Sequence, residues 1–175
     1  MHVGTLRWGV AGDWLSAALS DAEVARYRMM AQRAAEDEAD QWAAAGISAG
    51  AVVADVGCGP GAVSAVLAKL VGPQGGVHAV DRDPQALTLA RRAAQAEGLF
   101  NMDFGEGEAD RTGLETESVG VVMLRHVLAH NGGLEQAIVD HLASLVRPGG
   151  AVYLVDSEAS AMRWYPLQEA AVGSH

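Results

Sequence analysis

The sequence has 175 residues, of which 50% are hydrophobic and 19% are charged, and its formal net charge is −10 at pH 7. This length suits one domain, and the apolar fraction is ample for a buried core, which excludes a disordered chain. The acidic balance disfavours nucleic acid or an anionic membrane as a partner, because both are negatively charged. We expect Arg91 and Arg92 to lie on the solvated side of a helix rather than in a basic patch.

Segments typical of helices and of strands alternate along the chain. Helices are predicted at residues 20–45, 62–71, 83–98 and 133–150, and strands at 51–56, 76–81, 101–106, 119–125 and 151–157. The strands are uniformly apolar, which is typical of a parallel sheet covered on both faces. The fold class is therefore α/β, a doubly wound and mainly parallel sheet, in which ligands bind beyond the carboxyl ends of the strands.

Local signals set the expected ends of these helices. Ser20 or Asp21 is expected to cap the first helix, and Asp83 the third, where Pro84 occupies the first turn. The run Pro148–Gly150 is expected to end the last helix.

The signals for a compartment favour a soluble protein of the cytoplasm. Cys58 is the only cysteine, so no internal disulfide can form, as is usual in a reducing compartment. Residues 1–16 lack the apolar core and cleavage site of a signal peptide. No apolar run approaches the roughly 20 residues of a membrane span.

The glycine-rich turn after the first strand is the most informative feature. Gly57, Gly59 and Ala62 match the pattern G-x-G-x-x-G/A, and Asp81 follows Ala62 by 19 residues. This spacing is that of a dinucleotide-binding turn, in which the acidic residue binds ribose hydroxyls. Asp55, however, stands just before the first glycine, where a carboxylate repels a pyrophosphate and attracts an ammonium or sulfonium group. The turn therefore favours S-adenosylmethionine over NAD.

At these residues the sequence resembles the class I S-adenosylmethionine-dependent methyltransferases, in particular the small-molecule methyltransferase domains of the ubiquinone and menaquinone biosynthesis type. The resemblance implies that a methyl group passes to oxygen, nitrogen or carbon of a small-molecule acceptor, and that the cofactor becomes S-adenosylhomocysteine. It rests on "VVADVGCGPG" at 52–61, "VHAVDRDP" at 77–84, "GEGEADRTGL" at 105–114, "VGVVMLRHVLAH" at 119–130 and "LVRPGGAVYLVD" at 145–156.

The resemblance implies a cofactor site that begins at the first two strands. Asp55 would lie near the amino group of the cofactor, and Asp81 would bind the ribose, since a carboxylate accepts two hydrogen bonds from a diol. Arg82 would lie over the adenine. The turn residues that would hold the methionine end are Gly57, Gly59 and Gly61, with Cys58 either filling the turn or acting as a reactive thiol.

The third and fourth strands would complete this site. Glu108 and Ala109 would meet the adenine edge, where the family more often has an aspartate than a glutamate. Either carboxylate can accept a hydrogen bond from the exocyclic amine. Arg125 and His126 begin the loop after the fourth strand, which in this family commonly touches cofactor or acceptor.

His126 is the candidate catalytic residue, as a base for a hydroxyl acceptor. His126 and His130 are four residues apart, so they share a face if this segment is helical. They could then form half of a metal site, or simply pack against and cap that helix. No further cluster with metal-ligand spacing is visible, so no metal is expected.

The resemblance divides the chain into an N-terminal helical lid (1–49), a cofactor-binding α/β core (50–157) and a short C-terminal tail (158–175). Tyr27, Met29 and Met30 either line a pocket under the lid or belong to an amphipathic helix packed on the sheet. Only 19 residues follow Asp156, so we expect the last two of the usual seven strands to be missing.

A sheet that stops at its fifth strand would leave an apolar edge, and a homodimer is expected to cover it. Two alternatives to the enzyme follow from the sequence. The first is a non-catalytic or truncated cofactor-binding module of the same fold. The second is an NAD-dependent oxidoreductase, which Asp55 opposes.

Overall fold

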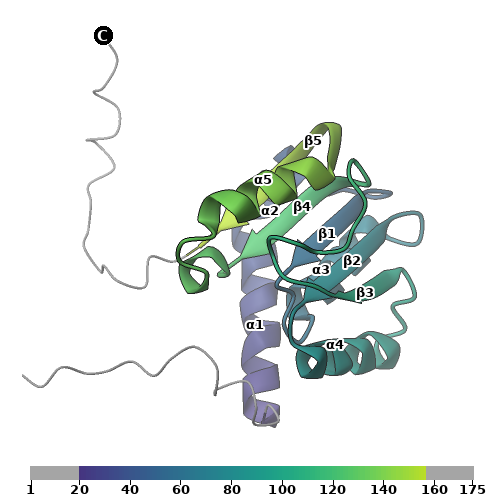
Figure 1. Cartoon of the computed structure of the whole chain (residues 1–175). Helices are drawn as coiled ribbons and strands as arrows, with labels where there is room; N and C mark the ends of the chain where they lie inside the picture. Colours follow the sequence, from purple (N-terminus) through teal and green to yellow (C-terminus); the bar gives the residue numbers. More distant parts are fainter. Residues whose placement is uncertain (1–19, 157–175) are drawn as a thin grey trace, which may run out of the picture.

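The computed structural model describes residues 20–156, which form a five-stranded parallel sheet in the order β3-β2-β1-β4-β5 (Figure 1). The strands are β1 Val52–Val56, β2 Gly76–Asp81, β3 Met102–Glu106, β4 Val119–Arg125 and β5 Val146–Val155. The helices are α1 Asp21–Asp37, α2 Ala39–Ala44, α3 Ala62–Val71, α4 Pro84–Ala96 and α5 Glu135–Leu145, with a 3-10 turn η1 at Leu128–His130. The doubly wound α/β fold expected from the sequence is confirmed. The tail expected at 158–175 and the first part of the expected lid lie outside the described residues.

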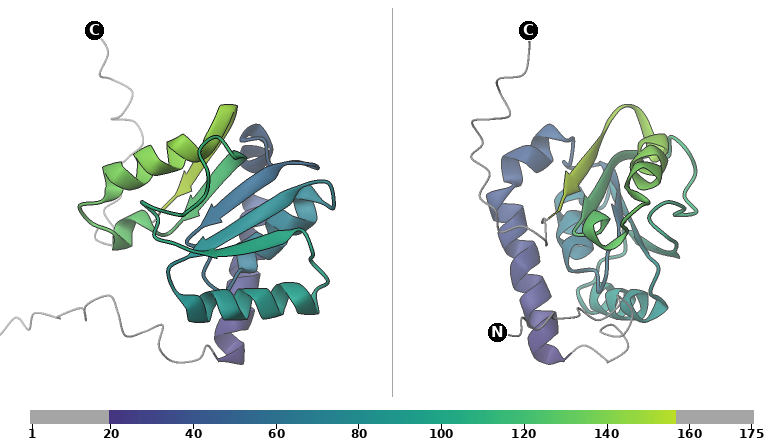
Figure 2. Two further views of the ribbon diagram at one scale, coloured as in Figure 1. Left: turned by 45° about the vertical axis from the view of Figure 1, so that its right-hand side comes forward. Right: turned by 60° about the vertical axis from the view of Figure 1, so that its left-hand side comes forward.

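Helices cover the sheet on both faces. Helices α1 and α3 lie on one face, and α5 packs on the other, against β4 and β5 (Figure 2). Successive side chains of a strand point to opposite faces, so Val53 joins the core with α3 while Ala54 joins the core with α5. Among residues 20–156, none of the helices has the length and apolar character that a membrane crossing requires.

The strand order places a switch point between β1 and β4. From β1 the chain crosses through α3 to β2, whereas β4 pairs with the other side of β1. The loops that leave the carboxyl ends of β1 and β4 therefore diverge, and such a crevice is where open α/β sheets bind ligands.

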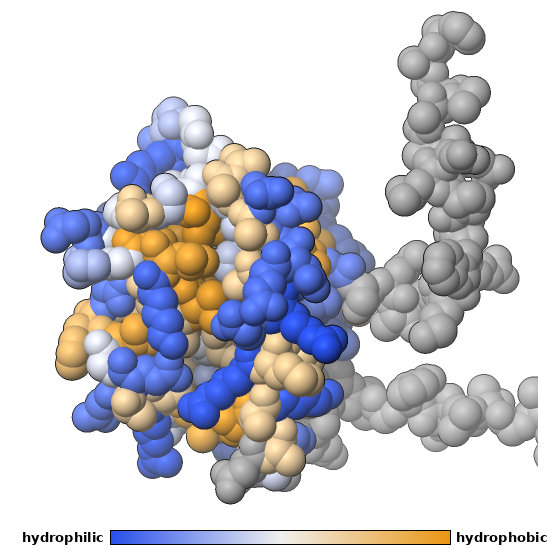
Figure 3. Space-filling model, turned by 180° about the vertical axis from the view of Figure 1, so that it is seen from behind, coloured by the Kyte–Doolittle hydropathy of each residue, from blue (hydrophilic) through white to orange (hydrophobic). Residues whose placement is uncertain are grey.

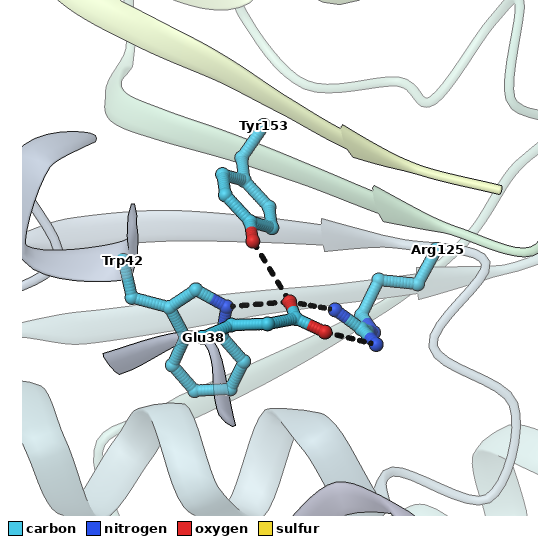
Figure 4. Close-up of polar contacts among 4 residues, drawn as sticks. All are labelled: Glu38, Trp42, Arg125 and Tyr153. Atoms are coloured by element: carbon cyan, nitrogen blue, oxygen red, sulfur yellow. Dashed lines mark hydrogen bonds and ion pairs between the residues drawn. The ribbon is translucent and has the colours of Figure 1, made fainter. Parts of the chain in front are cut away.

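The helix predicted over residues 20–45 is broken at Glu38. It begins as expected, with Ser20 as the cap in a reciprocal capping box with Glu23. Glu38 leaves the helical region at φ −113°. Its carboxylate instead binds Arg125 of β4, accepts from the hydroxyl of Tyr153 on β5, and α2 begins at the next residue (Figure 4). These tertiary contacts outweigh the helix propensity of the local sequence.

The last helix also ends earlier than predicted. Helix α5 stops at Leu145 and β5 begins at Val146, so the run Pro148–Gly150 lies inside the span of β5. The register with β4 shifts there, because Val119 pairs with Val146 and the next pair is Val121 with Ala151. Proline has no backbone N–H to donate, which fits an interruption of the ladder at this point.

The turn between β1 and α3 depends on glycine at its last position. Gly61 has φ +79°, in the left-handed region, and a Cβ placed on it would lie 2.7 Å from the Cβ of Ala90 on α4. Helix α4, whose predicted cap Asp83 and first residue Pro84 are confirmed, thus approaches the backbone of the turn directly.

We expect Gly61→Ala to destabilise the protein more than Gly98→Ala. Gly98 also has positive φ, +67°, but a Cβ there would meet nothing within 4 Å. Both changes incur about 1–2 kcal/mol for the left-handed conformation. Gly61→Ala adds an overpacking penalty of about 1–3 kcal/mol against α4. Urea unfolding of the two variants measures the difference, and equal losses would contradict the close approach of α4.

Candidate active site

The glycine turn is bonded to the end of the neighbouring strand β2. The backbone N–H groups of Gly57 and Cys58 both donate to the carbonyl oxygen of Val80, at 2.8 and 3.0 Å. Gly59 N donates to the Oδ2 of Asp81 at 2.7 Å. The turn is therefore fixed against β2 by three backbone donors.

Asp81 is held by both of its carboxylate oxygens. Besides Oδ2 on Gly59, its Oδ1 accepts from the backbone N–H of Asp83 at 2.9 Å, at the start of α4. A carboxylate offers about four acceptor positions, so two hydrogen bonds leave capacity for a diol. The residue expected to bind the ribose thus has a fixed orientation at the carboxyl end of β2.

Asp55 is buried rather than exposed at the mouth of the turn. It is 2% exposed, and its Oδ2 accepts from the hydroxyl of Ser64 on α3. Burial raises the pKa of Asp55 to about 6; Ser64 and the charge of Arg125 oppose the rise, and the charge of Asp81 adds to it. The turn is thus flanked by two carboxylates, an environment that stabilises a cationic ligand and disfavours a pyrophosphate.

Cys58 lies within the turn and is buried. Burial raises the pKa of its thiol, and the charges of Asp55 and Asp81 raise it further. The side chain is therefore a neutral thiol at physiological pH, which suits the filling of the turn and not the reactive alternative.

The residues expected at the adenine lie together at the ends of β2 and β3. The Nη1 of Arg82 is 3.9 Å from the Oε2 of Glu108, and both side chains are about half exposed. They line a shallow pocket with Glu106, Gly107 and Arg111. Ala109 is partly buried against the core on the α5 side of the sheet.

Arg125 binds Glu38, a residue to which the sequence assigned no role. Its Nη2 binds the Oε1 of Glu38 at 3.0 Å, its Nη1 binds the Oε2, and its side chain is only 13% exposed. Tyr153 and the indole N–H of Trp42 donate to the same Oε2, at 2.8 and 3.2 Å (Figure 4). Burial tends to raise the pKa of Glu38, but hydrogen bonds from Arg125 and Tyr153 outweigh it and hold the pKa below its usual value.

This arrangement gives the guanidinium group of Arg125 a partner within the fold, and its contact with the cofactor stays a prediction. Glu38 carries no local signal for this role, because it lies 87 residues from Arg125 and sits in an alanine-rich helical pattern.

His126 follows β4 in a left-handed conformation, with φ +55° and an exposed side chain. Its backbone N–H donates to Val155 of β5 at 2.8 Å. The chain therefore turns at His126 before η1 begins, so the condition for a shared helical face of His126 and His130 is not met. Within residues 20–156, no group of three or more His, Cys, Asp or Glu side chains is placed to hold a metal ion.

Helix α1 packs on α3 through small residues and turns its methionines outward. Ala31 and Ala34 are buried, whereas Met29 and Met30 are about half exposed. Tyr27 lines a groove between α1, α3 and α4. Seen from behind, the molecule carries an apolar area bordered by hydrophilic side chains (Figure 3). Tyr27 thus lines a groove, whereas Met29 and Met30 face outward, so both alternatives for these residues stay open.

Comparison with known proteins identifies the family. Residues 53–150 match the family described as "Methyltransferase domain". A probable cobalt-precorrin-6B C(15)-methyltransferase of Sulfolobus acidocaldarius is 36% identical over 60% of this chain and 53% of its own length. An arsenite methyltransferase of Halobacterium salinarum is 32% identical over 64% of this chain and 28% of its own length. The chain thus spans about half, or less, of these curated relatives.

Solved structures agree with this assignment. A SAM-dependent methyltransferase from Aquifex aeolicus has the same fold, with a TM-score of 0.66 at 20% identity over 83% of this chain and 78% of its own. An arsenic(III) S-adenosylmethionine methyltransferase from Chlamydomonas reinhardtii aligns with a TM-score of 0.55 at 31% identity, over 61% of this chain and 38% of its own. The chain belongs to the methyltransferase domain family, as its resemblance predicted, and the cofactor of that family is S-adenosylmethionine.

Replacement of Asp55 by asparagine tests the burial of its charge. Because the folded pKa, about 6, exceeds the ordinary 3.8, the carboxyl group stabilises the fold most at low pH. That contribution is lost as the pH rises from about 4 to 6 and stays absent above. Asp55→Asn keeps an acceptor for Ser64 without the charge. Its stability relative to the wild type should therefore rise by about 2 kcal/mol between pH 4 and 7.5, because part of the full shift, at 1.36 kcal/mol for each pKa unit, already lies below pH 4.

Urea unfolding at pH 4, 5, 6 and 7.5 measures this difference. Asp37→Asn is the matched control, because it makes the same substitution at an exposed position at the end of α1. A flat difference for Asp55→Asn would contradict the burial of an ionised carboxylate beneath the turn.

Proposed function

We propose that this chain binds S-adenosylmethionine at the carboxyl ends of β1, β2 and β3 and transfers its methyl group to a small-molecule acceptor. The observation that carries the proposal is the glycine turn flanked by two carboxylates, Asp55 and Asp81. Asp55 is the feature that favours a sulfonium cofactor over NAD, since a dinucleotide would bring a pyrophosphate to this position.

The turn has the shape that close approach of a ligand needs. A Cβ placed on Gly59 would meet nothing within 4 Å, so the backbone there borders open space next to Asp81. Gly57 and Gly61 also have positive φ, but a Cβ on either would meet a side chain of the fold, Val127 or Ala90, so the open space of the turn lies at Gly59. This cradle fits the methionine end of the cofactor.

Each residue of the site then has a role set by its charge. Asp81 accepts from the ribose hydroxyls, Arg82 and Glu108 hold the adenine, and the buried charge of Asp55 favours the ammonium group. The cofactor supplies an electrophilic methyl carbon on a cationic sulfur. The chain contributes orientation and exclusion of water, which supply much of the rate in such a displacement. His126, exposed after β4, is proposed as the base where the acceptor must lose a proton.

The relatives support a small-molecule acceptor. Those named above act on a precorrin and on arsenite, and a third, similar over 41% of this chain, is an aklanonic acid methyltransferase from a Streptomyces strain. We infer that the partners of this chain include neither nucleic acid nor a membrane, in keeping with its net charge of −10. We also propose a cytoplasmic location, and a division of the chain into an N-terminal lid, a cofactor-binding core and a short tail.

Calorimetric titration with S-adenosylmethionine, S-adenosylhomocysteine, adenosine and NAD tests the cofactor. We expect the first three to bind and NAD not to bind. Asp81→Asn should weaken all three by about 10-fold or more, the equivalent of one hydrogen bond to a charged group. Asp55→Asn should weaken the two ligands that carry an ammonium group and leave adenosine unchanged. Binding of NAD alone would overturn the proposal, and binding without methyl transfer to any acceptor would favour the non-catalytic module.

A homodimer is proposed to cover the edge of β5. Within residues 20–156, β5 pairs with β4 on one side only, and Leu154 is 41% exposed. An unpaired apolar strand edge is a template for association with another chain. Light scattering should give twice the monomer mass for the wild type. Leu154→Lys, which places a charge at this edge, should shift the mass toward the monomer, and a monomeric wild type would exclude the dimer.

A further inference from the structure

His141 of α5 contacts a residue outside the site described so far. Its Nε2 lies 2.9 Å from the backbone nitrogen of Thr112 and 2.9 Å from the Oγ1 of the same residue. Thr112 is 3% exposed and lies in the connection between β3 and β4. A backbone N–H can only donate, so Nε2 must carry a lone pair. The imidazole is therefore neutral, with its proton on Nδ1.

Thr112 forms the base of a turn that carries the residues expected at the adenine. Glu108 and Arg111 pair as an isolated bridge, and Arg111 N donates to Glu108 O at 3.0 Å. At the base, a Cβ on Gly107 would lie 2.6 Å from the carbonyl oxygen of Thr112. Gly107 N in turn donates to the carbonyl oxygen of Asp81 at 3.1 Å. The position of Thr112 therefore fixes where the turn 107–112 stands relative to the end of β2.

We propose that His141 is a positioning residue for cofactor binding, whose neutral imidazole holds the turn 107–112 so that Glu108 and Ala109 stand beside Asp81 and Arg82. This inference rests on the proposed function of the same site. The side-chain hydrogen bonds of His141 go to Thr112, so it acts on Glu108 and Ala109 through Thr112 and Gly107.

Protonation of His141 would oppose this arrangement. A second proton on Nε2 would face the backbone N–H of Thr112, donor against donor, and the burial of Thr112 denies that group a water partner. The charged group that favours the cation is Asp110, from the turn itself; on α5 the neighbouring Asp140 accepts from Gln136. Burial lowers the pKa of His141 and Asp110 opposes it. The neutral form thus prevails at pH 7.5, and its stabilising effect is lost as the pH falls below 6.5.

Two variants separate the acceptor from the titration. His141→Gln places an amide oxygen at a similar reach, which accepts from Thr112 but does not titrate. His141→Ala removes the acceptor at every pH. Affinity for S-adenosylhomocysteine is measured at pH 7.5 and pH 5 for the wild type and both variants. Asp55 titrates in the same pH range, but it is present in all three proteins. The ratio of their affinities for S-adenosylhomocysteine at one pH therefore reports the effect of residue 141 alone.

We expect the wild type and His141→Gln to bind S-adenosylhomocysteine alike at pH 7.5, and the wild type to become the weaker binder of the two as the pH falls below 6.5 toward 5. His141→Ala should be weaker than His141→Gln at both values. Asp110→Asn, which removes the opposing charge, should move the loss in the wild type to lower pH. If the ratio of the wild-type affinity to the His141→Gln affinity is the same at pH 7.5 and at pH 5, the positioning role is overturned.

Amide hydrogen exchange of Thr112 in the protein alone gives a readout that needs no ligand. Its protection should fall between pH 7.5 and pH 5 in the wild type and stay constant in His141→Gln, after correction for the intrinsic rates. Equal protection in both proteins at both values would overturn the inference. If no variant binds S-adenosylhomocysteine at pH 7.5, the proposed function fails, and the exchange measurement alone decides whether His141 holds the turn.

Discussion

The glycine turn of this protein is bonded to the strand beside it, and the geometry of the site depends on that bond. Val80 accepts from two successive N–H groups of the turn, and Asp81 accepts from a third. The turn therefore cannot shift without breaking contacts at the end of β2. In the same way, Asp81 cannot change its orientation without releasing Gly59 and the first turn of α4. A single set of hydrogen bonds thus orders the cradle and the acidic residue together, before any ligand arrives.

The electrostatics of this site work against the stability of the fold. A buried carboxylate such as Asp55 is penalised in its ionised form, and a second carboxylate, Asp81, stands near enough to raise its pKa further. A domain selected for stability alone would place a neutral residue there. Charges that are unfavourable in the folded protein and favourable to a ligand are typical of functional sites. The positive charge of Arg125 partly offsets this penalty, because it lowers the pKa of Asp55.

The sequence predicted what depends on local pattern. Apolar runs placed all five strands, the glycines placed the turn, and Asp83 with Pro84 placed the start of α4. The errors fall where distant residues decide. The break at Glu38 depends on Arg125, 87 residues away, and no feature of the helical pattern around Glu38 announces it. At His126, too, a distant residue takes part, because its backbone N–H donates to Val155 of β5. The prediction that Pro148–Gly150 ends the last helix was wrong, because α5 ends at Leu145 and the run lies within β5, where the register with β4 shifts.

Three long-range contacts near the carboxyl ends of the strands have the same structural role. Gly59 with Asp81, Glu38 with Arg125 and Thr112 with His141 each join a loop or helix junction to a different element of the fold. In two of them the side chain that holds the contact is not among the residues expected at the cofactor. Glu38 ties the N-terminal helices to β4 and β5, and His141 ties the turn after β3 to α5. A motif search finds the residues that face a ligand, because their spacing is local. The residues that hold those ligand-facing groups in place have no such spacing, so only the three-dimensional arrangement separates them from ordinary surface side chains.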